Sequence, residues 1–170
     1  MKYFNGFSLR GEDIFFKEQL VESNYSVAGF SYGAQQAFEY VYNSTERIDR
    51  LILISPAFFQ NHKESYIKRQ LKAYERDSRT YCKLFLENVT YPSSITLDKY
   101  LKEGSVEELE SLLTYEWSIN KIEELIARGI IIEVFIGEKD KIVDAQKSFE
   151  FFSGLVTVYF IKDVGHLLKN

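Results

Sequence analysis

The sequence predicts an α/β fold in which a three-layer, mostly parallel sheet carries a helical lid. Strand-like and helix-like segments alternate near both ends of the chain, and roughly sixty residues between them have helical periods and no good strand. Arg50–Ser55 (RLILIS) contains a continuous run of leucine and isoleucine, typical of a parallel strand that is buried on both faces. We therefore expect residues 1–56 and 119–170 to form the core and residues 57–118 to form the lid.

The first part of the chain contains three predicted strands. Lys2–Phe7 is a short apolar run with an Asn-Gly pair, which suits a strand that enters a turn. Pro56 ends the buried run that begins at Arg50. The other elements expected before Pro56 are a helix over Gly11–Glu22, a strand over Tyr25–Phe30 and a helix over Ala34–Tyr42.

The second part of the chain contains clear helix boundaries. Ser105 and Glu108 have the spacing of a capping box that opens a helix, and Gly104 is expected to end the helix before it. Gly129 ends a further helix. The remaining elements are expected at Ile122–Arg128 (helix), Ile130–Ile136 (strand), Val143–Phe152 (helix) and Val156–Ile161 (strand).

The composition describes one globular domain. The 170 residues are 45% hydrophobic and 27% charged, with two prolines, which argues against a disordered chain. The single cysteine, Cys82, allows no internal disulfide and fits a reducing compartment. No secretory signal or membrane span is readable, so we expect a cytoplasmic protein without a membrane partner. The net charge of -4 argues against a nucleic-acid partner.

The candidate nucleophile is Ser31. It is the central residue of Gly29-Phe30-Ser31-Tyr32-Gly33, which fits G-x-S-x-G between a predicted strand and a predicted helix. This context matters because the serine of that motif lies on a tight turn, where glycines let strand and helix converge. The alternative is a glycine-lined turn in which Ser31 only caps the helix.

A serine nucleophile needs a histidine base and a carboxylate that orients it. His166 follows the last predicted strand, on the same edge of a parallel sheet as Ser31, whereas His62 begins the predicted lid. Asp140 follows the strand IIIEVFI and lies on that edge too. The chain order Ser31, Asp140, His166 is that of α/β-hydrolases. Competing acids are Asp163, which ranks second, and Glu138 and Asp144.

An oxyanion formed at Ser31 needs two backbone N–H donors. One is the amide of Tyr32, directly after the nucleophile. For the other we choose Phe7, in the loop after the first strand, where Gly6 lets the backbone turn close to a substrate. An ordinary Asn-Gly turn is the alternative.

These motifs occur in the order GFSYG, LILISPA, GEKD and VGH along nearly the whole chain, and they resemble a minimal α/β-hydrolase shortened at its N-terminus. The small size, FNGFSL near residue 1 and FSYGAQQAFEY resemble more narrowly the short pimelyl-[acyl-carrier protein] methyl ester esterases of biotin synthesis (BioV type). That resemblance implies hydrolysis of a methyl ester on a carrier-bound pimeloyl chain. Two features depart from the wider family: Asn5-Gly6 replaces a His-Gly pair, and the usual N-terminal strand pair is missing.

A basic stripe is expected on the predicted lid. Seven cations and three acids between Lys63 and Lys83 give this segment a net charge of +4, against -8 for the rest of the chain. On one helix the cations would form a single stripe, beside an apolar stripe that packs on the core. Acyl carrier proteins are strongly acidic, so we expect the carrier to dock on this stripe. The expected docking residues are Lys68, Arg69, Lys72, Arg76 and Arg79.

The expected reaction is acyl transfer to water, with no metal and no organic cofactor. Two alternatives stay open: a generic small-acyl esterase or thioesterase, and a non-catalytic hydrolase-like binding protein. The sequence leaves the oligomeric state open.

Overall fold

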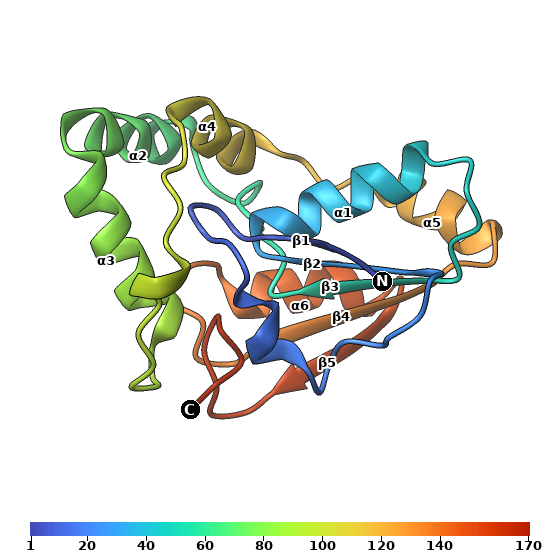
Figure 1. Ribbon diagram of the computed structural model, residues 1–170. Coiled ribbons are helices and arrows are strands. Elements are labelled where there is room, and N and C mark those ends of the chain that lie inside the picture. The colour runs from blue at the N-terminus through green and yellow to red at the C-terminus, as the bar shows by residue number, and fades with distance from the viewer.

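A computed structural model describes all 170 residues, and its centre is a five-stranded parallel sheet in the order β1-β2-β3-β4-β5 (Figure 1). Each strand pairs with the next strand in the chain, so the carboxyl ends of all five lie along one edge. The α/β fold class predicted from the sequence is confirmed. The strands are β1 (Lys2–Phe4), β2 (Ser26–Phe30), β3 (Arg50–Ile54), β4 (Ile131–Gly137) and β5 (Thr157–Ile161).

One face of the sheet is covered by the helices that connect the strands: α1 (Tyr32–Asn43), α5 (Ile119–Ala127) and α6 (Ala145–Ser153). Alternate strand residues such as Val27, Leu51 and Val134 belong to the same buried cluster as Phe38 and Phe152 from these helices. No helix of the protein is both long and apolar enough to cross a membrane.

The opposite face is covered by the 3₁₀-helix η1 (Glu12–Phe16), by α3 (Ser78–Thr90) and by the last residues of the chain. The intervening strand residues point to this side, where Phe30 and Ile54 pack against Phe16, Val89 and Leu167. Both faces are therefore buried, which explains why the central strands are mostly apolar.

The N-terminal segment differs from two predictions. The predicted strand Lys2–Phe7 ends at Phe4, and the predicted helix Gly11–Glu22 is only the short η1. Polar side chains organise the backbone between them: Gly11 N donates to Asn5 Oδ1 at 2.9 Å, and Gly6 N donates to Glu12 Oε1 at 2.7 Å. Such side-chain contacts satisfy backbone groups locally and replace strand or helix pairing.

Residues 57–118, here called the insertion, contain α2 (Glu64–Arg76), α3, the 3₁₀-helix η2 (Asp98–Tyr100) and α4 (Val106–Thr114). The predicted capping box opens α4, because Ser105 and Glu108 exchange both of its hydrogen bonds. The prediction that Gly104 ends a helix was wrong. No helix ends there, and a Cβ at Gly104 would lie 2.6 Å from Ser8 Oγ, so the glycine permits a close approach to the loop after β1.

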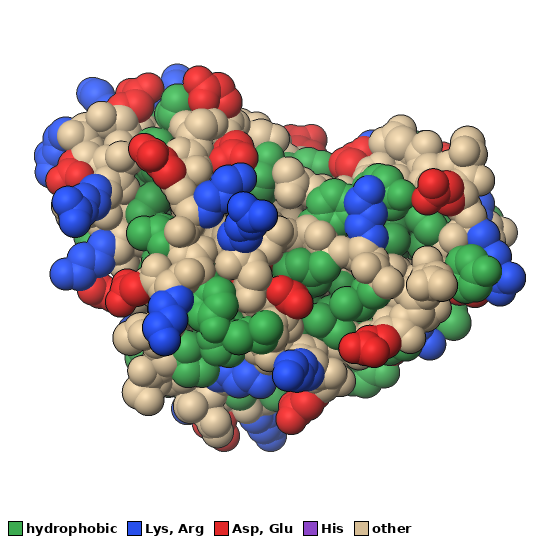
Figure 2. All heavy atoms as spheres, viewed as in Figure 1, with side chains coloured by type: hydrophobic (Ala, Val, Ile, Leu, Met, Phe, Trp, Pro, Cys, Tyr) green, Lys and Arg blue, Asp and Glu red, His purple; other side chains and the backbone are tan.

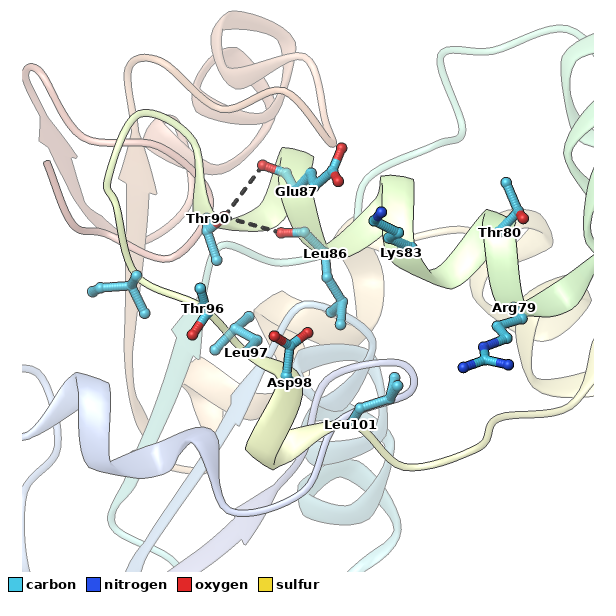
Figure 3. A pocket seen from close by; sticks show the side chains of 11 residues that line it. Arg79, Thr80, Lys83, Leu86, Glu87, Thr90, Thr96, Leu97, Asp98 and Leu101 are labelled. Carbon is cyan, nitrogen blue, oxygen red and sulfur yellow. Dashed lines mark hydrogen bonds between the residues drawn. The ribbon is translucent and has the colours of Figure 1, made fainter.

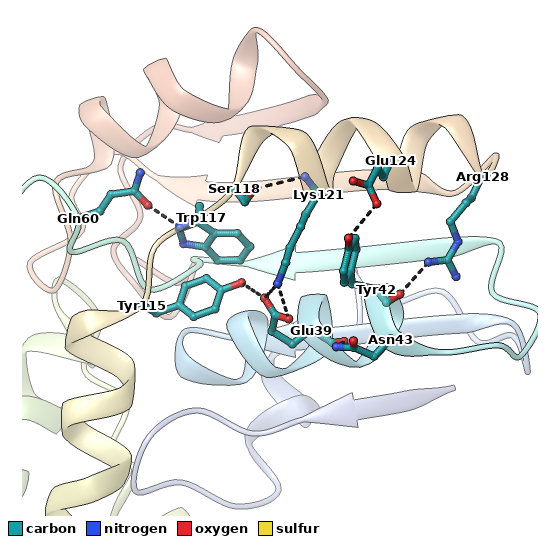
Figure 4. Close-up of polar contacts among 10 residues, drawn as sticks. All are labelled: Glu39, Tyr42, Asn43, Gln60, Tyr115, Trp117, Ser118, Lys121, Glu124 and Arg128. Carbon is teal, nitrogen blue, oxygen red and sulfur yellow. Dashed lines mark hydrogen bonds and ion pairs between the residues drawn. The ribbon is translucent and has the colours of Figure 1, made fainter.

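Trp117 joins the two ends of the insertion (Figure 4). Its indole Nε1 donates to Ala57 O at 2.9 Å, and its backbone N donates to Gln60 Oε1 at 2.7 Å. Glu39 on α1 accepts hydrogen bonds from Tyr115 and Lys121 on the returning chain. These hydrogen bonds hold the start and the end of the insertion together, and they attach its end to α1.

Candidate active site

Ser31 lies in the turn between β2 and α1 with φ 54° and ψ −115°, a backbone conformation that serine rarely adopts. Surrounding contacts hold it there, because Ser31 N donates to Ile54 O at 2.9 Å and Ala57 N donates to Ser31 O at 3.2 Å. Close approach of neighbouring backbone atoms also requires the flanking glycines. A Cβ at Gly29 would lie 2.1 Å from Gly33 O, and one at Gly33 would lie 2.1 Å from Phe4 O.

His166 and Asp140 form a fully buried pair. His166 Nδ1 lies 2.6 Å from Asp140 Oδ2, and both side chains are 0% exposed. The other carboxylate oxygen, Oδ1, accepts hydrogen bonds from the amides of Ile142 at 2.7 Å and Val143 at 3.0 Å. These two amides fix the carboxylate, so Oδ2 faces the imidazole and leaves Nε2 free to accept a proton.

The imidazole lies beside the turn that carries Ser31. Its ring centroid is 5.0 Å from that of Phe30, the residue before Ser31, and Ser55 Oγ donates to His166 O at 2.6 Å. Ser31 Oγ and His166 Nε2 are both buried, and neither has a hydrogen-bond partner. The structure thus pairs Asp140 with His166 but does not join His166 to Ser31 by a hydrogen bond.

The competing candidates lie elsewhere. Asp163 is 70% exposed and pairs with Lys139, while Glu138 accepts a hydrogen bond from the Asp163 amide. Asp144 caps α6 by accepting from Lys147 N, and His62 stacks on the ring of Tyr66. None of these side chains contacts His166, which leaves Asp140 as its acidic partner.

The amides of Phe7 and Tyr32 have no partner in the fold that competes for them. Tyr32 is the first residue of α1, where an N–H has no intrahelical acceptor, and Phe7 N donates to no protein acceptor. Both residues line one cavity of about 270 Å³, together with Gly6, Ser8 and Gly104. The two backbone donors chosen from the sequence therefore border a common space.

The insertion closes the site. Lys102 N donates to Ser8 O at 2.9 Å, and Arg10 N donates to Tyr100 O at 2.8 Å, so the chain beside η2 pairs with the loop after β1. Ser31 is 2% exposed and His166 is 0% exposed. Both side chains are therefore buried in this closed arrangement.

A second, mostly apolar cavity of about 260 Å³ lies between the insertion and the core. Phe59, Phe85 and Leu113 belong to its lining, as does Ile142, whose amide holds Asp140. Ile142 thus connects this apolar cavity with Asp140, although neither Asp140 nor His166 lines it.

The expected single basic stripe was wrong, because two helices divide it. α2 ends at Arg76, and Asp77 caps the separate helix α3 by accepting from Thr80 N. Lysine and arginine side chains nevertheless gather with acidic ones over α2 and α3, on the left of Figure 2. The neighbouring apolar stripe does pack on the core, where Tyr74 and Cys82 are buried.

Arg79 and Lys83 on α3 border a cavity of about 490 Å³ between that helix and residues 95–101 (Figure 3). Glu87 and Asp98 line it too, so its charges balance. It is separate from the space next to Phe7 and Tyr32.

Sequence reasoning missed two side chains that support this region, Glu12 and Ser55. Glu12 lies in η1 and is 0% exposed, and burial raises the pKa of its carboxyl despite hydrogen bonds from Gly6 and Tyr3. Ser55 holds the backbone of His166. The position of Ser55 at the carboxyl end of β3 was a usable signal, whereas nothing in the sequence marked Glu12.

Comparison with solved structures gives the α/β-hydrolase fold. The chain is similar to a bromoperoxidase from Bacillus anthracis (TM-score 0.67, 15% identity, 90% of this chain and 64% of that one). It is similar to naproxen esterase (carboxylesterase NP) from Bacillus subtilis (TM-score 0.58, 17% identity, 92% and 57%). BioG from Haemophilus influenzae matches with a TM-score of 0.59 and 11% identity, over 97% of this chain and 87% of BioG.

These similarities show the fold alone: a five-stranded parallel sheet with helices on both faces, as in the α/β-hydrolase fold. The chain spans about three fifths of the length of the first two neighbours. No family model matches the sequence, and no curated protein matches it.

Proposed function

We propose that this chain is a serine carboxylester hydrolase in which Ser31, His166 and Asp140 form the catalytic triad. The observation that carries the proposal is the fully buried His166–Asp140 pair beside a serine held at φ 54° between strand and helix. Burial of an aspartate and a histidine is costly unless a specific arrangement compensates for it, so a buried pair of this kind supports a functional site.

The proposed chemistry is acyl transfer from the ester to water. Ser31 Oγ attacks the ester carbonyl while His166 Nε2 takes its proton, and Asp140 stabilises the imidazolium through Nδ1. The amides of Phe7 and Tyr32 receive the oxyanion, and His166 returns the proton to the leaving alcohol. Water then repeats the cycle on the acyl-enzyme. Before the first step, Ser31 Oγ and His166 Nε2 must move into hydrogen-bonding distance, which accompanies opening of the insertion for substrate.

For the substrate we propose the methyl ester of pimelyl-[acyl-carrier protein], which yields pimelyl-[acyl-carrier protein] and methanol in biotin biosynthesis. The resemblance of FNGFSL and FSYGAQQAFEY to the short esterases of that reaction supports it, together with the likeness to BioG along 97% of the chain. The apolar cavity beside Ile142 offers room for a methylene chain.

The decisive experiment compares wild type with Ser31→Ala on carrier-bound pimelyl methyl ester, with product followed by mass spectrometry. We expect the variant to lose roughly 10⁴-fold or more in kcat. A fluorophosphonate probe should label the wild type and not Ser31→Ala. An unlabelled wild type would support a non-catalytic binding protein, and faster cleavage of a plain acyl-carrier thioester would support a thioesterase.

The carrier is proposed to dock on Lys68, Arg69, Lys72, Arg76 and Arg79, now divided between α2 and α3. All five side chains are exposed, and Lys68 already pairs with Glu64 at 2.7 Å. Converting Lys72 and Arg76 to Glu should weaken activity on the carrier-bound substrate and spare a small p-nitrophenyl ester. Lys17→Glu with Lys162→Glu, which changes the net charge equally outside the insertion, is the matched control. Equal losses from both pairs would contradict docking at this surface.

A further inference from the structure

A buried carboxyl group outside the proposed triad contacts the loop that carries Phe7. Glu12 is 0% exposed, and its Oε1 accepts hydrogen bonds from Gly6 N at 2.7 Å and from Tyr3 Oη at 3.2 Å. Its Oε2 is buried without any partner, and no ion pair reaches the side chain. A buried carboxyl with half of its acceptors unused is expensive for the fold and calls for an explanation.

We propose that Glu12 is a positioning residue for the oxyanion hole: it holds Gly6 so that the Phe7 amide points into the cavity shared with Tyr32. The proposal rests on the esterase function proposed above. Glu12 touches no reacting atom and acts only through the loop from Asn5 to Ser8.

Backbone geometry explains how a bond to Gly6 sets the direction of the next amide. The Gly6–Phe7 peptide is planar and trans, so its C=O and N–H point in opposite directions. Leu9 N donates to Gly6 O at 3.1 Å, which turns that carbonyl into the loop and the Phe7 N–H away from it. The hydrogen bond from Gly6 N to Glu12 fixes the preceding peptide, which joins Asn5 to Gly6. With both neighbours held, the Phe7 amide has one direction available.

The rest of the loop needs this support because its other backbone hydrogen bonds are to the insertion. Ser8 and Arg10 are bonded to residues 100–102 of the insertion, whose opening belongs to the mechanism proposed above. On the core side the loop is held by Glu12 and by the bond from Gly11 N to Asn5 Oδ1. Glu12 therefore keeps the oxyanion donor in place while the insertion is open.

The acceptor role requires an oxygen and no charge. Burial raises the pKa of the Glu12 carboxyl, and the two donors on Oε1 leave Oε2 as the place for a proton. Glutamine presents the same acceptor oxygen to Gly6, whereas methionine fills similar space without any acceptor. These two substitutions separate hydrogen bonding from packing.

The test measures kcat and KM on a p-nitrophenyl ester for wild type, Glu12→Gln, Glu12→Met and Val41→Ala. Val41 is fully buried at the far end of α1, so its variant serves as a control for lost stability. We expect Glu12→Met to lose roughly tenfold to hundredfold in kcat with KM little changed, since a displaced oxyanion donor weakens only transition-state binding. Glu12→Gln should retain most of the rate, and the Gly6 amide should exchange with solvent faster in Glu12→Met alone.

Each outcome bears on one claim. A Glu12→Met enzyme that melts earlier, like Val41→Ala, yet keeps its kcat would overturn the positioning role in favour of packing. Equal kcat losses in Glu12→Met and Glu12→Gln would overturn it as well, because the acceptor would then not matter. If wild type is no faster than Ser31→Ala, the esterase proposal itself fails, while the Gly6 exchange measurement still reports whether Glu12 holds the loop.

Discussion

Replacing Gly33 with alanine tests whether the contact between α1 and the end of β1 sets the catalytic geometry. An added Cβ would lie 2.1 Å from Phe4 O and 2.5 Å from Asn5 O. Ordinary van der Waals contact begins at 3.4 Å. The start of α1 and the backbone that leads from β1 into the following loop must therefore separate by about 1.3 Å, the difference between 3.4 and 2.1 Å. Both atoms struck are backbone, so no side chain can rotate away to relieve the clash.

The expected effect is large on rate and moderate on stability. A displacement of about 1 Å between reacting groups costs roughly 10²-fold in rate, so kcat on a p-nitrophenyl ester should fall about that much. Overpacking of this kind costs about 1–3 kcal/mol, which lowers the melting temperature by about 2–4 °C for each kcal/mol in a chain of this size. Both values come from the same purified protein, by steady-state kinetics and by thermal unfolding followed by circular dichroism.

Gly154→Ala is the matched control, because Gly154 follows α6 at φ −78° and a Cβ there meets nothing within 4 Å. It should melt no earlier than wild type and keep its activity. A Gly33→Ala protein with the rate and melting temperature of wild type would refute the reasoning, since it would mean that the loop and helix separate freely. Should Gly33→Ala not fold at all, fluorophosphonate labelling of Gly29→Ala tests the same convergence from the strand side.

Three further predictions concern single groups. Ser31→Gly should abolish esterase activity and raise the melting temperature by about 2–4 °C relative to Ser31→Ala, because glycine relieves about 1 kcal/mol of strain at φ 54°. Asp140→Asn should lower kcat by roughly 10⁴-fold, measured by steady-state kinetics, because an amide cannot accept from two backbone amides and from His166 together. Burial raises the pKa of Glu12 above 4.5, so its contribution to stability is fully present below pH 4.5 and is lost as pH rises through the raised value. Denaturant titrations should show this decline in wild type and not in Glu12→Gln, with Tyr3 and Asp13 as the ionisable neighbours in both.

Much of the fold was predictable because local patterns carry it. The central strands and connecting helices lie within one to three residues of their expected bounds, since each has an apolar period that burial on a parallel sheet requires. The capping box of Ser105 and Glu108 predicts the start of a helix from residues three positions apart, and both of its hydrogen bonds are present. Ser31, Asp140 and His166 each follow a strand, so parallel topology alone predicts one shared edge.

Two of the predictions that failed depend on which side chain bonds to a nearby backbone group, which apolar or charge spacing does not reveal. A repeat of cations every three or four residues looks the same on one helix or on two, and only the cap formed by Asp77 shows where α2 stops. The segment Gly11–Glu22 has helical spacing, yet Glu12 turns inward to Gly6 and Tyr3 and leaves only a short 3₁₀-helix.

By itself the sequence determined the strand–helix order, the strained turn at Ser31 and the identity of the residues at the carboxyl edge of the sheet. Each of these follows from spacing along the chain, where backbone periodicity and glycine conformation act over a few residues. Only the tertiary structure decided that Asp140 contacts His166, that Glu12 bonds to the loop after β1 and that Ser31 is buried. Those outcomes depend on which polar side chains are buried together. That is decided only when the segments pack against one another, so no single segment of the sequence reveals it.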